Sequence, residues 1–223
     1  MLNLIFVVIL SYLAGSIPTS IITSRLVRGI DIREHGSGNA GGSNVFRVLG
    51  WKYGILVILL DALKGALAVI VVARLYLDSF PFSNITPFDD FTLVQIICGV
   101  TAVIGHIWTV FAGFRGGKGI ATGLGVLIMI VTIDMALALG IFFLVVTFSR
   151  YISLGSIAAA VAVPLILIVR ENIFGIDIQG YHTVLPFTIA LALLVIYTHR
   201  KNIDRIFKGS ESKVSFVKRN RYK

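Results

Sequence analysis

Residues 119–149 read GIATGLGVLIMIVTIDMALALGIFFLVVTFS, an apolar stretch interrupted by one charged residue, Asp134. A membrane-spanning helix needs about 20 predominantly apolar residues. At a rise of about 1.5 Å per residue, this stretch is too long for one comfortable span and short for two. The number of times it crosses the membrane decides on which side the rest of the chain emerges.

The composition is that of a membrane protein. Of the 223 residues, 57% are hydrophobic and 14% are charged, and the mean hydropathy is +0.92. Soluble domains carry about 25% charged residues. Further candidate spans are Leu2–Ser24, Trp51–Tyr76, Phe91–Ala112, Gly155–Val169 and Val184–His199. The first has no basic residue before Arg25, which favours a retained membrane helix over a secretory signal.

The distribution of basic residues indicates whether residues 119–149 cross the membrane once or twice. If residues 119–149 turn near Asp134 and cross twice, all but three of the 20 Lys and Arg residues lie on one side. The opposite loops then carry mainly acids, namely Asp78, Asp89, Asp90, Glu171 and Asp177. Lys and Arg accumulate in cytosolic loops. We therefore predict seven transmembrane helices, with the N-terminus outside, the C-terminus cytosolic, and two short helices meeting near Asp134.

The predicted fold class is an all-α integral membrane protein. Residues 1–223 would form a single membrane domain ending in a basic cytosolic tail, about residues 205–223, that faces lipid headgroups or is disordered. The net charge of +9 does not indicate a nucleic-acid partner, because the basic residues form no single block. Cys98 is the only cysteine, which excludes an intrachain disulfide and a cysteine-based zinc cage.

Three patches of glycine and small polar residues, of which the first two also hold cations, lie on the predicted cytosolic side: residues 36–47 (GSGNAGGSNVFR), 113–119 (GFRGGKG) and 153–156 (SLGS). Such loops can direct main-chain N–H groups at phosphate oxygens. The first patch matches G-x-G-x-x-G but follows a membrane helix, so a dinucleotide fold is excluded. The second lacks P-loop spacing and the magnesium-binding hydroxyl. Flexible polar turns and membrane-anchoring cations are the plain alternatives.

Charged residues also occur inside the predicted spans. Asp61 and Lys64 stand at i and i+3, close enough to pair on one helix face. Ionised side chains at this depth face protein or water, so we interpret them as a structural ion pair. His106 is interpreted as a hydrogen-bonded packing residue. His199 ends the last span beside basic residues, at the depth of the three patches.

The chain offers no Ser-His-Asp, Cys-His or paired-carboxylate arrangement, and no cluster with metal-ligand spacing. A reaction that needs little from a protein base is therefore favoured. Acyl transfer from an acyl donor with a phosphate leaving group fits, since the protein then mainly positions the reactants and neutralises oxyanions.

Several ordered motifs resemble those of the bacterial acyl-phosphate:glycerol-3-phosphate acyltransferase family. They are residues 36–39 (GSGN) with 44–50 (NVFRVLG), Asp61 with Lys64 and Gly65, residues 105–108 (GHIW) with 114–122 (FRGGKGIAT), Ser156, and residues 199–203 (HRKNI). The resemblance implies seven membrane helices in the bacterial inner membrane and an active site facing the cytosol. It also implies transfer of a fatty acyl chain from acyl phosphate to the 1-hydroxyl of glycerol 3-phosphate, giving lysophosphatidate (1-acylglycerol 3-phosphate) and inorganic phosphate in phospholipid biosynthesis.

Roles carried over by matching position fall into two sets. The resemblance implies that the acyl-phosphate headgroup is held by Ser37, Asn39, Ser43, Asn44 and Ser156. Glycerol 3-phosphate would be bound by Arg47, Lys118, His199 and Asn202, of which the first three are the catalytic candidates. The expected partners are the two substrates and membrane lipids; no cofactor, metal or obligate protein partner is expected.

The sequence departs from the usual family pattern at four positions. Ala40, Gly42, Ser43 and Thr109 replace the more common proline, alanine, threonine and proline. We expect the first two to loosen the first loop, whereas Ser43 keeps a hydroxyl.

Two other classes of function are less consistent with the sequence. The alternative to an enzyme is a transporter or binding protein for anionic lipid precursors, although transporter sites lie near mid-bilayer and these patches lie at one face. A magnesium-dependent phosphotransferase is disfavoured by the lack of an acidic cluster. For the acyltransferase, a phosphate oxygen of the donor is the hypothesised proton acceptor, because cations flank His199.

Overall fold

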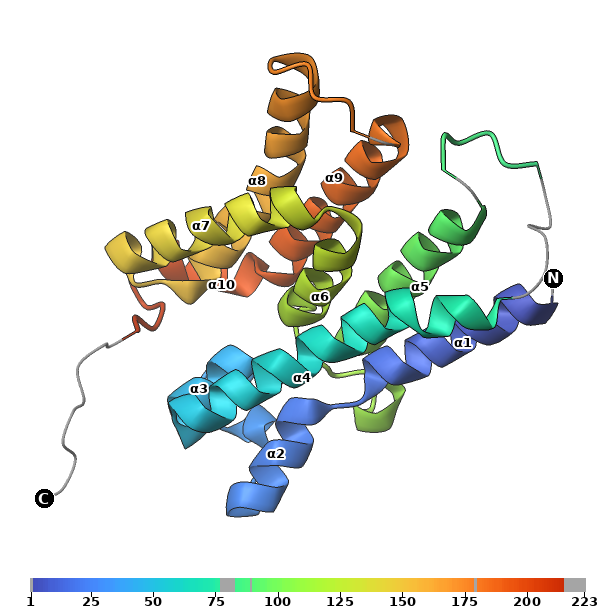
Figure 1. Ribbon diagram of the computed structural model, residues 1–223. Helices are drawn as coiled ribbons and strands as arrows, with labels where there is room; N and C mark the ends of the chain where they lie inside the picture. The colour runs from blue at the N-terminus through green and yellow to red at the C-terminus, as the bar shows by residue number, and fades with distance from the viewer. Residues whose placement is uncertain (1, 77–82, 89, 179, 215–223) are drawn as a thin grey trace, which may run out of the picture.

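A computed structural model describes residues 2–76, 83–88, 90–178 and 180–214, and these are helical with no strand among them (Figure 1). The helices are α1 (Leu2–Ser16), α2 (Thr19–Arg28), η1 (Ile32–Glu34), α3 (Gly42–Leu49), α4 (Trp51–Ile70), η2 (Val72–Leu75), α5 (Asp90–Ile107), η3 (Val110–Ala112), α6 (Ile120–Ile130), α7 (Thr132–Ser149), α8 (Ile152–Asn172), α9 (Tyr181–Thr198) and α10 (Arg200–Phe207). Asp78, Asp89 and residues 215–223 of the predicted tail lie outside the described residues.

Six helical segments of the described chain are long and apolar enough to cross a membrane. They are Leu2–Arg28, Trp51–Leu75, Asp90–Ala112, Thr132–Ser149, Ile152–Asn172 and Tyr181–Thr198. Their bounds agree with the predicted spans to within a few residues, which confirms an all-α membrane protein. The first segment is broken at Ile17 and Pro18, so that α1 and α2 are separate helices.

Residues 119–149 divide at Val131, three residues before Asp134, into α6 and α7. α7 has 18 residues and is long enough to span, so of the two helices only α6, with 11 residues, is short. Asp134 accepts a hydrogen bond of 2.7 Å from Arg170, which lies near the end of α8. The beginning of α7 and the end of α8 therefore lie at the same end of the molecule.

The long helices form two groups joined by α6. α1, α4 and α5 lie together, α7, α8 and α9 form the second group, and α6 stands between them (Figure 1). The largest apolar cluster runs across this junction, from Ile96 of α5 through Leu127 of α6 to Met135, Val163 and Val184 of the second group. Many other large apolar side chains are exposed, as expected for helices that face lipid.

Glycines allow α4 and α6 to approach closely. A Cβ on Gly65 of α4 would collide with the Thr122 carbonyl of α6, and a Cβ on Gly125 of α6 would collide with the Ala62 carbonyl of α4. Small residues at such contacts let helix backbones meet in a membrane, where the hydrophobic effect does not drive helix association. The pairing fixes α6 and, with it, the loop that precedes α6.

Gly125→Ala is expected to destabilise the protein, because its methyl group meets main chain of α4 rather than a side chain that can move. Overpacking of this kind costs about 1–3 kcal/mol. Gly123→Ala is the matched control on the same helix, since a Cβ at Gly123 has no neighbour within 4 Å. Thermal unfolding of purified protein in detergent should show a lower Tm for Gly125→Ala only. Equal Tm values for the two variants would contradict the packing.

Candidate functional site

Asn44 holds the first glycine loop together from inside. Its side-chain N–H₂ donates to the carbonyls of Ile32, His35 and Asn39, and its Oδ1 accepts from the main-chain N–H of Ser37. Gly36 and Gly38 have φ of 62° and 72°, the left-handed region that favours glycine. The polar atoms of Asn44 are thus engaged in shaping the loop.

The other candidates of this loop are placed on its accessible side. Ser37 is exposed, and Asn39 and Ser43 are half-buried. Ser43 lies in the first turn of α3, and Arg47 lies exposed in the last turn of the same helix. α3 packs tightly against α4, because Gly54 of α4 lies against the backbone of Phe46.

The second glycine loop carries Lys118 to the end of α9 and the start of α10. Gly116 and Gly117 donate main-chain hydrogen bonds to the carbonyls of Ile107 and His106, which return the loop to the end of α5. The Lys118 carbonyl accepts a 3.4 Å bond from Thr198, and the Lys118 ammonium donates to Oδ1 of Asn202. Two predicted site residues, 84 positions apart in the sequence, are therefore in direct contact.

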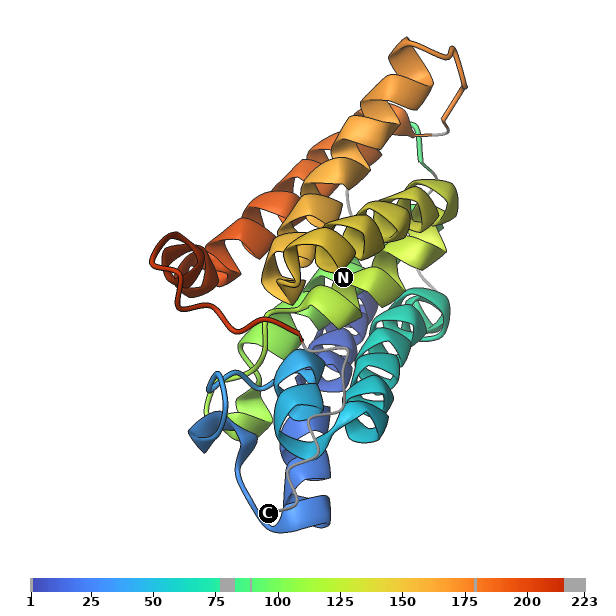
Figure 2. The ribbon, with the colours of Figure 1, turned by 90° about the vertical axis from the view of Figure 1, so that its left-hand side faces the viewer.

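A carboxylate from the C-terminal segment completes this group. Glu211 accepts hydrogen bonds from Asn202 at 2.8 Å, Ser153 at 3.0 Å and Arg205 at 2.7 Å. The segment after α10 folds back, since Val214 donates its main-chain N–H to the Arg150 carbonyl at 2.8 Å. Figure 2 shows this segment leaving α10 and passing the start of α8. Glu211 and Val214 therefore contact the rest of the protein, whereas Lys208 and Lys213 of the same segment are exposed.

The site has an excess of positive charge. Burial lowers the pKa of Lys118 from 10.5 to about 8; Glu211 opposes this shift, while Arg205 and Arg47 add to it. Desolvation also lowers the pKa of Arg47, opposed by Glu211 and reinforced by Arg205. Burial alone would raise the pKa of Glu211, but the bonds from Arg205, Asn202 and Ser153 outweigh it and lower that pKa. Three cations thus surround one ionised carboxylate.

His199 is held as a neutral ring. Burial and the nearby Lys118 ammonium lower its pKa from 6.5 to about 4, although the Val195 carbonyl and Glu211 oppose the shift. Nδ1 lies 2.8 Å from the Val195 carbonyl oxygen, which can only accept, so Nδ1 carries the proton. Nε2 is then left as a hydrogen-bond acceptor.

Of the four residues predicted to bind glycerol 3-phosphate, Lys118 and Asn202 are in direct contact, and the charges of Arg47 and His199 lie within electrostatic range of Lys118. Ser156 lies nearby on α8, one turn beyond Ser153, and donates its hydroxyl to the Ile152 carbonyl at 3.0 Å. The first loop reaches the second through Ala40, whose carbonyl oxygen lies beside Gly117. No group of three or more potential metal-ligating side chains occurs within the described residues.

Sequence reasoning missed Glu211 and Arg205 as members of this group, whereas Ser153 belongs to the third predicted patch. Glu211 is the last acidic residue of a basic segment. It follows Gly209, which comes just after α10 and has a positive φ of 66°. A single acidic residue after a glycine at the end of a helix could have indicated that this segment folds back towards the cations.

Comparisons with known proteins identify the family of this chain. The chain matches the family described as Glycerol-3-phosphate acyltransferase over residues 5–209. The chain belongs to the glycerol-3-phosphate acyltransferase family. A relative of that name from Chlorobaculum tepidum is 46% identical, over 99% of this chain and all of the relative, and one from Chlorobaculum parvum is 44% identical over the same shares.

Solved structures give the same result for this family member. A crystal structure of PlsY (YgiH), an integral membrane glycerol 3-phosphate acyltransferase in its glycerol 3-phosphate form, has a TM-score of 0.77 and 37% identity, covering 95% of this chain and 96% of that one. Its lysophosphatidic acid form has a TM-score of 0.76. The chain is thus a membrane glycerol-3-phosphate acyltransferase, and the predicted family resemblance is confirmed.

Two departures from the family pattern have structural explanations. Gly42 does not loosen the first loop as expected: it is buried, and a Cβ there would lie 3.1 Å from the Gly54 carbonyl oxygen and collide with Ile58. Thr109 is buried and donates its hydroxyl to the Ser16 carbonyl, at the end of α1. In this acyltransferase both positions serve close contacts between segments.

Proposed function

We propose that this enzyme transfers a fatty acyl chain from acyl phosphate to the 1-hydroxyl of glycerol 3-phosphate, releasing lysophosphatidate and inorganic phosphate. The observation that carries the proposal is the cationic group around Lys118, which suits a dianionic phosphate. The solved PlsY forms, one with glycerol 3-phosphate and one with lysophosphatidic acid, support the acceptor and the product. An enzyme in phospholipid biosynthesis is favoured over a transporter or binding protein because of the family.

Each set of residues has a distinct role in the proposal. Arg47 and Lys118 bind the phosphate of glycerol 3-phosphate as cations, and Asn202 orients the Lys118 ammonium through their hydrogen bond. His199 accepts a hydrogen bond from a substrate hydroxyl at Nε2. The acyl-phosphate headgroup is bound by Ser37, Asn39, Ser43 and Ser156, with Asn44 holding the loop that presents three of them.

The proton of the attacking hydroxyl goes to the leaving phosphate. The hydroxyl oxygen bonds to the acyl carbon, the bond from that carbon to the phosphate oxygen breaks, and phosphate leaves as hydrogen phosphate with the hydroxyl proton. His199, with a pKa of about 4, is a weaker base than phosphate oxygens, whose second pKa is about 6. The cations neutralise the developing negative charge, so no protein base is required.

The proposed topology has seven membrane helices, with α6 as a short seventh span, in a bacterial inner membrane. The loops that hold Arg47, Lys118, His199 and Glu211 lie at one end of the helices, and the Asp134–Arg170 pair lies at the other. Because the end with the site is also the basic end, we place the site on the cytosolic side. The N-terminus is then outside and the C-terminus cytosolic.

The donor is tested by offering purified protein acyl phosphate, acyl-CoA and acyl carrier protein thioester separately. With acyl phosphate, we expect lysophosphatidate and inorganic phosphate in equal amounts, and phosphate release only when glycerol 3-phosphate is present. The two thioesters should give less than about 1% of that rate. Phosphate release without an acceptor, or equal rates with acyl-CoA, would contradict the proposal.

The binding role of Lys118 predicts a specific pH dependence. Its lowered pKa means that the ammonium is charged below about pH 8 and loses its charge above it. The KM for glycerol 3-phosphate should therefore rise towards about tenfold per pH unit above pH 8. His199 stays neutral over pH 7–9.5, and so does not contribute. Lys118→Arg is the diagnostic variant, because its guanidinium stays charged at this pH. Its KM for glycerol 3-phosphate should not change between pH 8 and 9.5. A rise in KM equal to that of the wild type would show that Lys118 does not bind this substrate.

Topology is tested by labelling single cysteines in a Cys98→Ala background. Ile85, 95% exposed in the loop before α5, and Lys208, exposed after α10, are each replaced by cysteine. A membrane-impermeant maleimide applied to spheroplasts should label the cysteine at 85, whereas the one at 208 should react only after the membrane is opened. The reverse pattern, or labelling of both from outside, would refute the orientation.

A further inference from the structure

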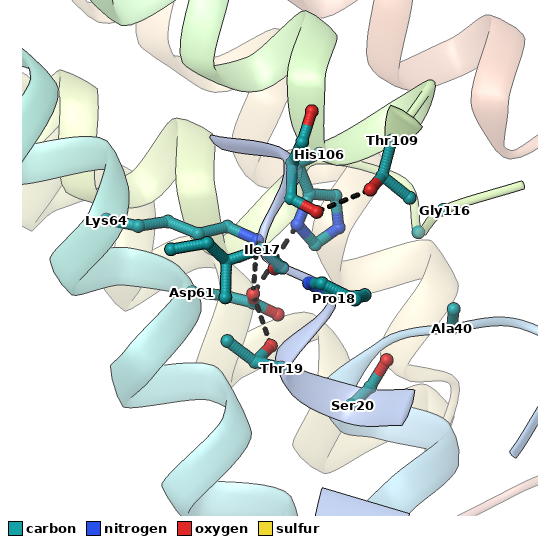
Figure 3. Close-up of a pocket in the computed structure, with 12 residues that line it drawn as sticks. Ile17, Pro18, Thr19, Ser20, Ala40, Asp61, Lys64, His106, Thr109 and Gly116 are labelled. Carbon is teal, nitrogen blue, oxygen red and sulfur yellow. Dashed lines mark hydrogen bonds and ion pairs between the residues drawn. The ribbon is translucent and has the colours of Figure 1, made fainter. Parts of the chain in front are cut away.

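A buried group of charged and polar side chains lies where α1 ends and α2 begins (Figure 3). Oδ1 of Asp61 accepts a hydrogen bond of 2.7 Å from Thr19 and lies 2.8 Å from the Lys64 ammonium and 3.5 Å from Nδ1 of His106. The Asp61, Lys64 and His106 side chains are 2%, 8% and 6% exposed. The predicted Asp61–Lys64 ion pair is therefore confirmed, and His106 adjoins it.

This group is rigidly fixed. The Lys64 ammonium also donates to the Ile17 carbonyl at 2.8 Å, in the break between α1 and α2. Removing one partner from a buried ion pair leaves an uncompensated charge, which costs about 3–5 kcal/mol. Asp61 is thereby held in place, and Nδ1 of His106 faces its Oδ1 at 3.5 Å without another hydrogen-bond partner among the described residues.

The opposite edge of the imidazole touches the second glycine loop. A Cβ on Gly117 would collide with Nε2 of His106 and would lie 2.6 Å from the Ala40 carbonyl oxygen of the first loop. Figure 3 shows Gly116 and Ala40 on two different segments, both on the side of the ring away from Lys64. The cavity left between these residues measures only about 10 Å³. The two loops therefore meet beside one side chain with little free space.

We propose that His106 is a positioning residue that sets the spacing between the two glycine loops, with Asp61 fixing the orientation of its ring. This inference rests on the proposed function, because the first loop carries the acyl-phosphate contacts and the second carries Lys118. Each loop is held by other bonds as well, through Asn44 in the first and the Lys118–Asn202 contact in the second. These bonds hold each loop separately, and His106 sets the distance between the two loops.

A change in that distance acts on the rate of reaction more than on binding. Each substrate keeps its own contacts when His106 is lost, so its KM changes little. The reacting atoms, however, belong to two substrates held by two loops. A misplacement of about 1 Å can cost about 100-fold in rate.

Kinetics of three substitutions at this position test the proposal. His106→Ala should lower kcat at least about tenfold while the KM for each substrate stays within about threefold. His106→Gln, which is long enough to reach Gly117, should retain most of kcat. His106→Asn, which can face Asp61 but is too short to reach the loop, should behave like alanine. His182→Ala, an exposed histidine at the far end of α9, is the control and should match the wild type.

Hydrogen exchange of the main chain supplies a readout that needs neither substrate. In His106→Ala and His106→Asn, residues 36–44 and 113–119 should exchange faster than in wild type and in His182→Ala, with Tm close to that of wild type. Unchanged exchange in both loops overturns the proposal whatever the activity, and so does unchanged kcat in His106→Asn. The proposed function can fail separately. If the wild-type protein has no activity with acyl phosphate but both loops still exchange faster in the variants, the loop contact is supported and the proposed function is refuted. If His106→Ala does not fold, the comparison of glutamine with asparagine decides the outcome.

Discussion

The contact between Lys118 and Asn202 joins two segments that lie 84 positions apart in the chain. It connects the loop before α6 to α10, and so links the two groups of long helices at the basic end of the molecule. Burying an ammonium there is unfavourable, as the lowered pKa of Lys118 indicates. The protein offsets that cost with an amide oxygen and a nearby carboxylate. A bound phosphate group with two negative charges would offset the cost of burying the Lys118 ammonium further. The burial of this ammonium therefore favours phosphate binding.

Hydrocarbon surroundings explain why so few residues decide the arrangement. Two charged pairs lie inside the helical region of the described chain: Asp61 is paired with Lys64, and Asp134 with Arg170. The first lies in the middle of α4, beside the break between α1 and α2, and the second joins the start of α7 to the end of α8. Glycine contacts between α4 and α6 complete the frame, because they leave the loop before α6 little freedom.

The sequence was sufficient for the helices, and it singled out Arg47 and Lys118, whose charges act on each other in the structure. Apolar runs of about 20 residues predict membrane-spanning helices, and the basic residues mark one end. The division between α6 and α7 was predictable, because the distribution of basic residues required residues 119–149 to turn near Asp134. Glu211 was not predictable in this way, because its position depends on a segment folding back to Arg150, which leaves no periodic pattern. The tight fit of Gly42 against α4 depends on helix packing and was likewise invisible in sequence.

Glu211 follows every membrane helix in the order of synthesis, yet it lies among residues from α8 and α10 and beside the cation of the second loop. A chain shortened before Glu211 would therefore keep every membrane helix and all three cations but would lack the carboxylate among them. Its cations would repel one another without a counter-charge, and the pKa of Lys118, which Glu211 raises, would fall further.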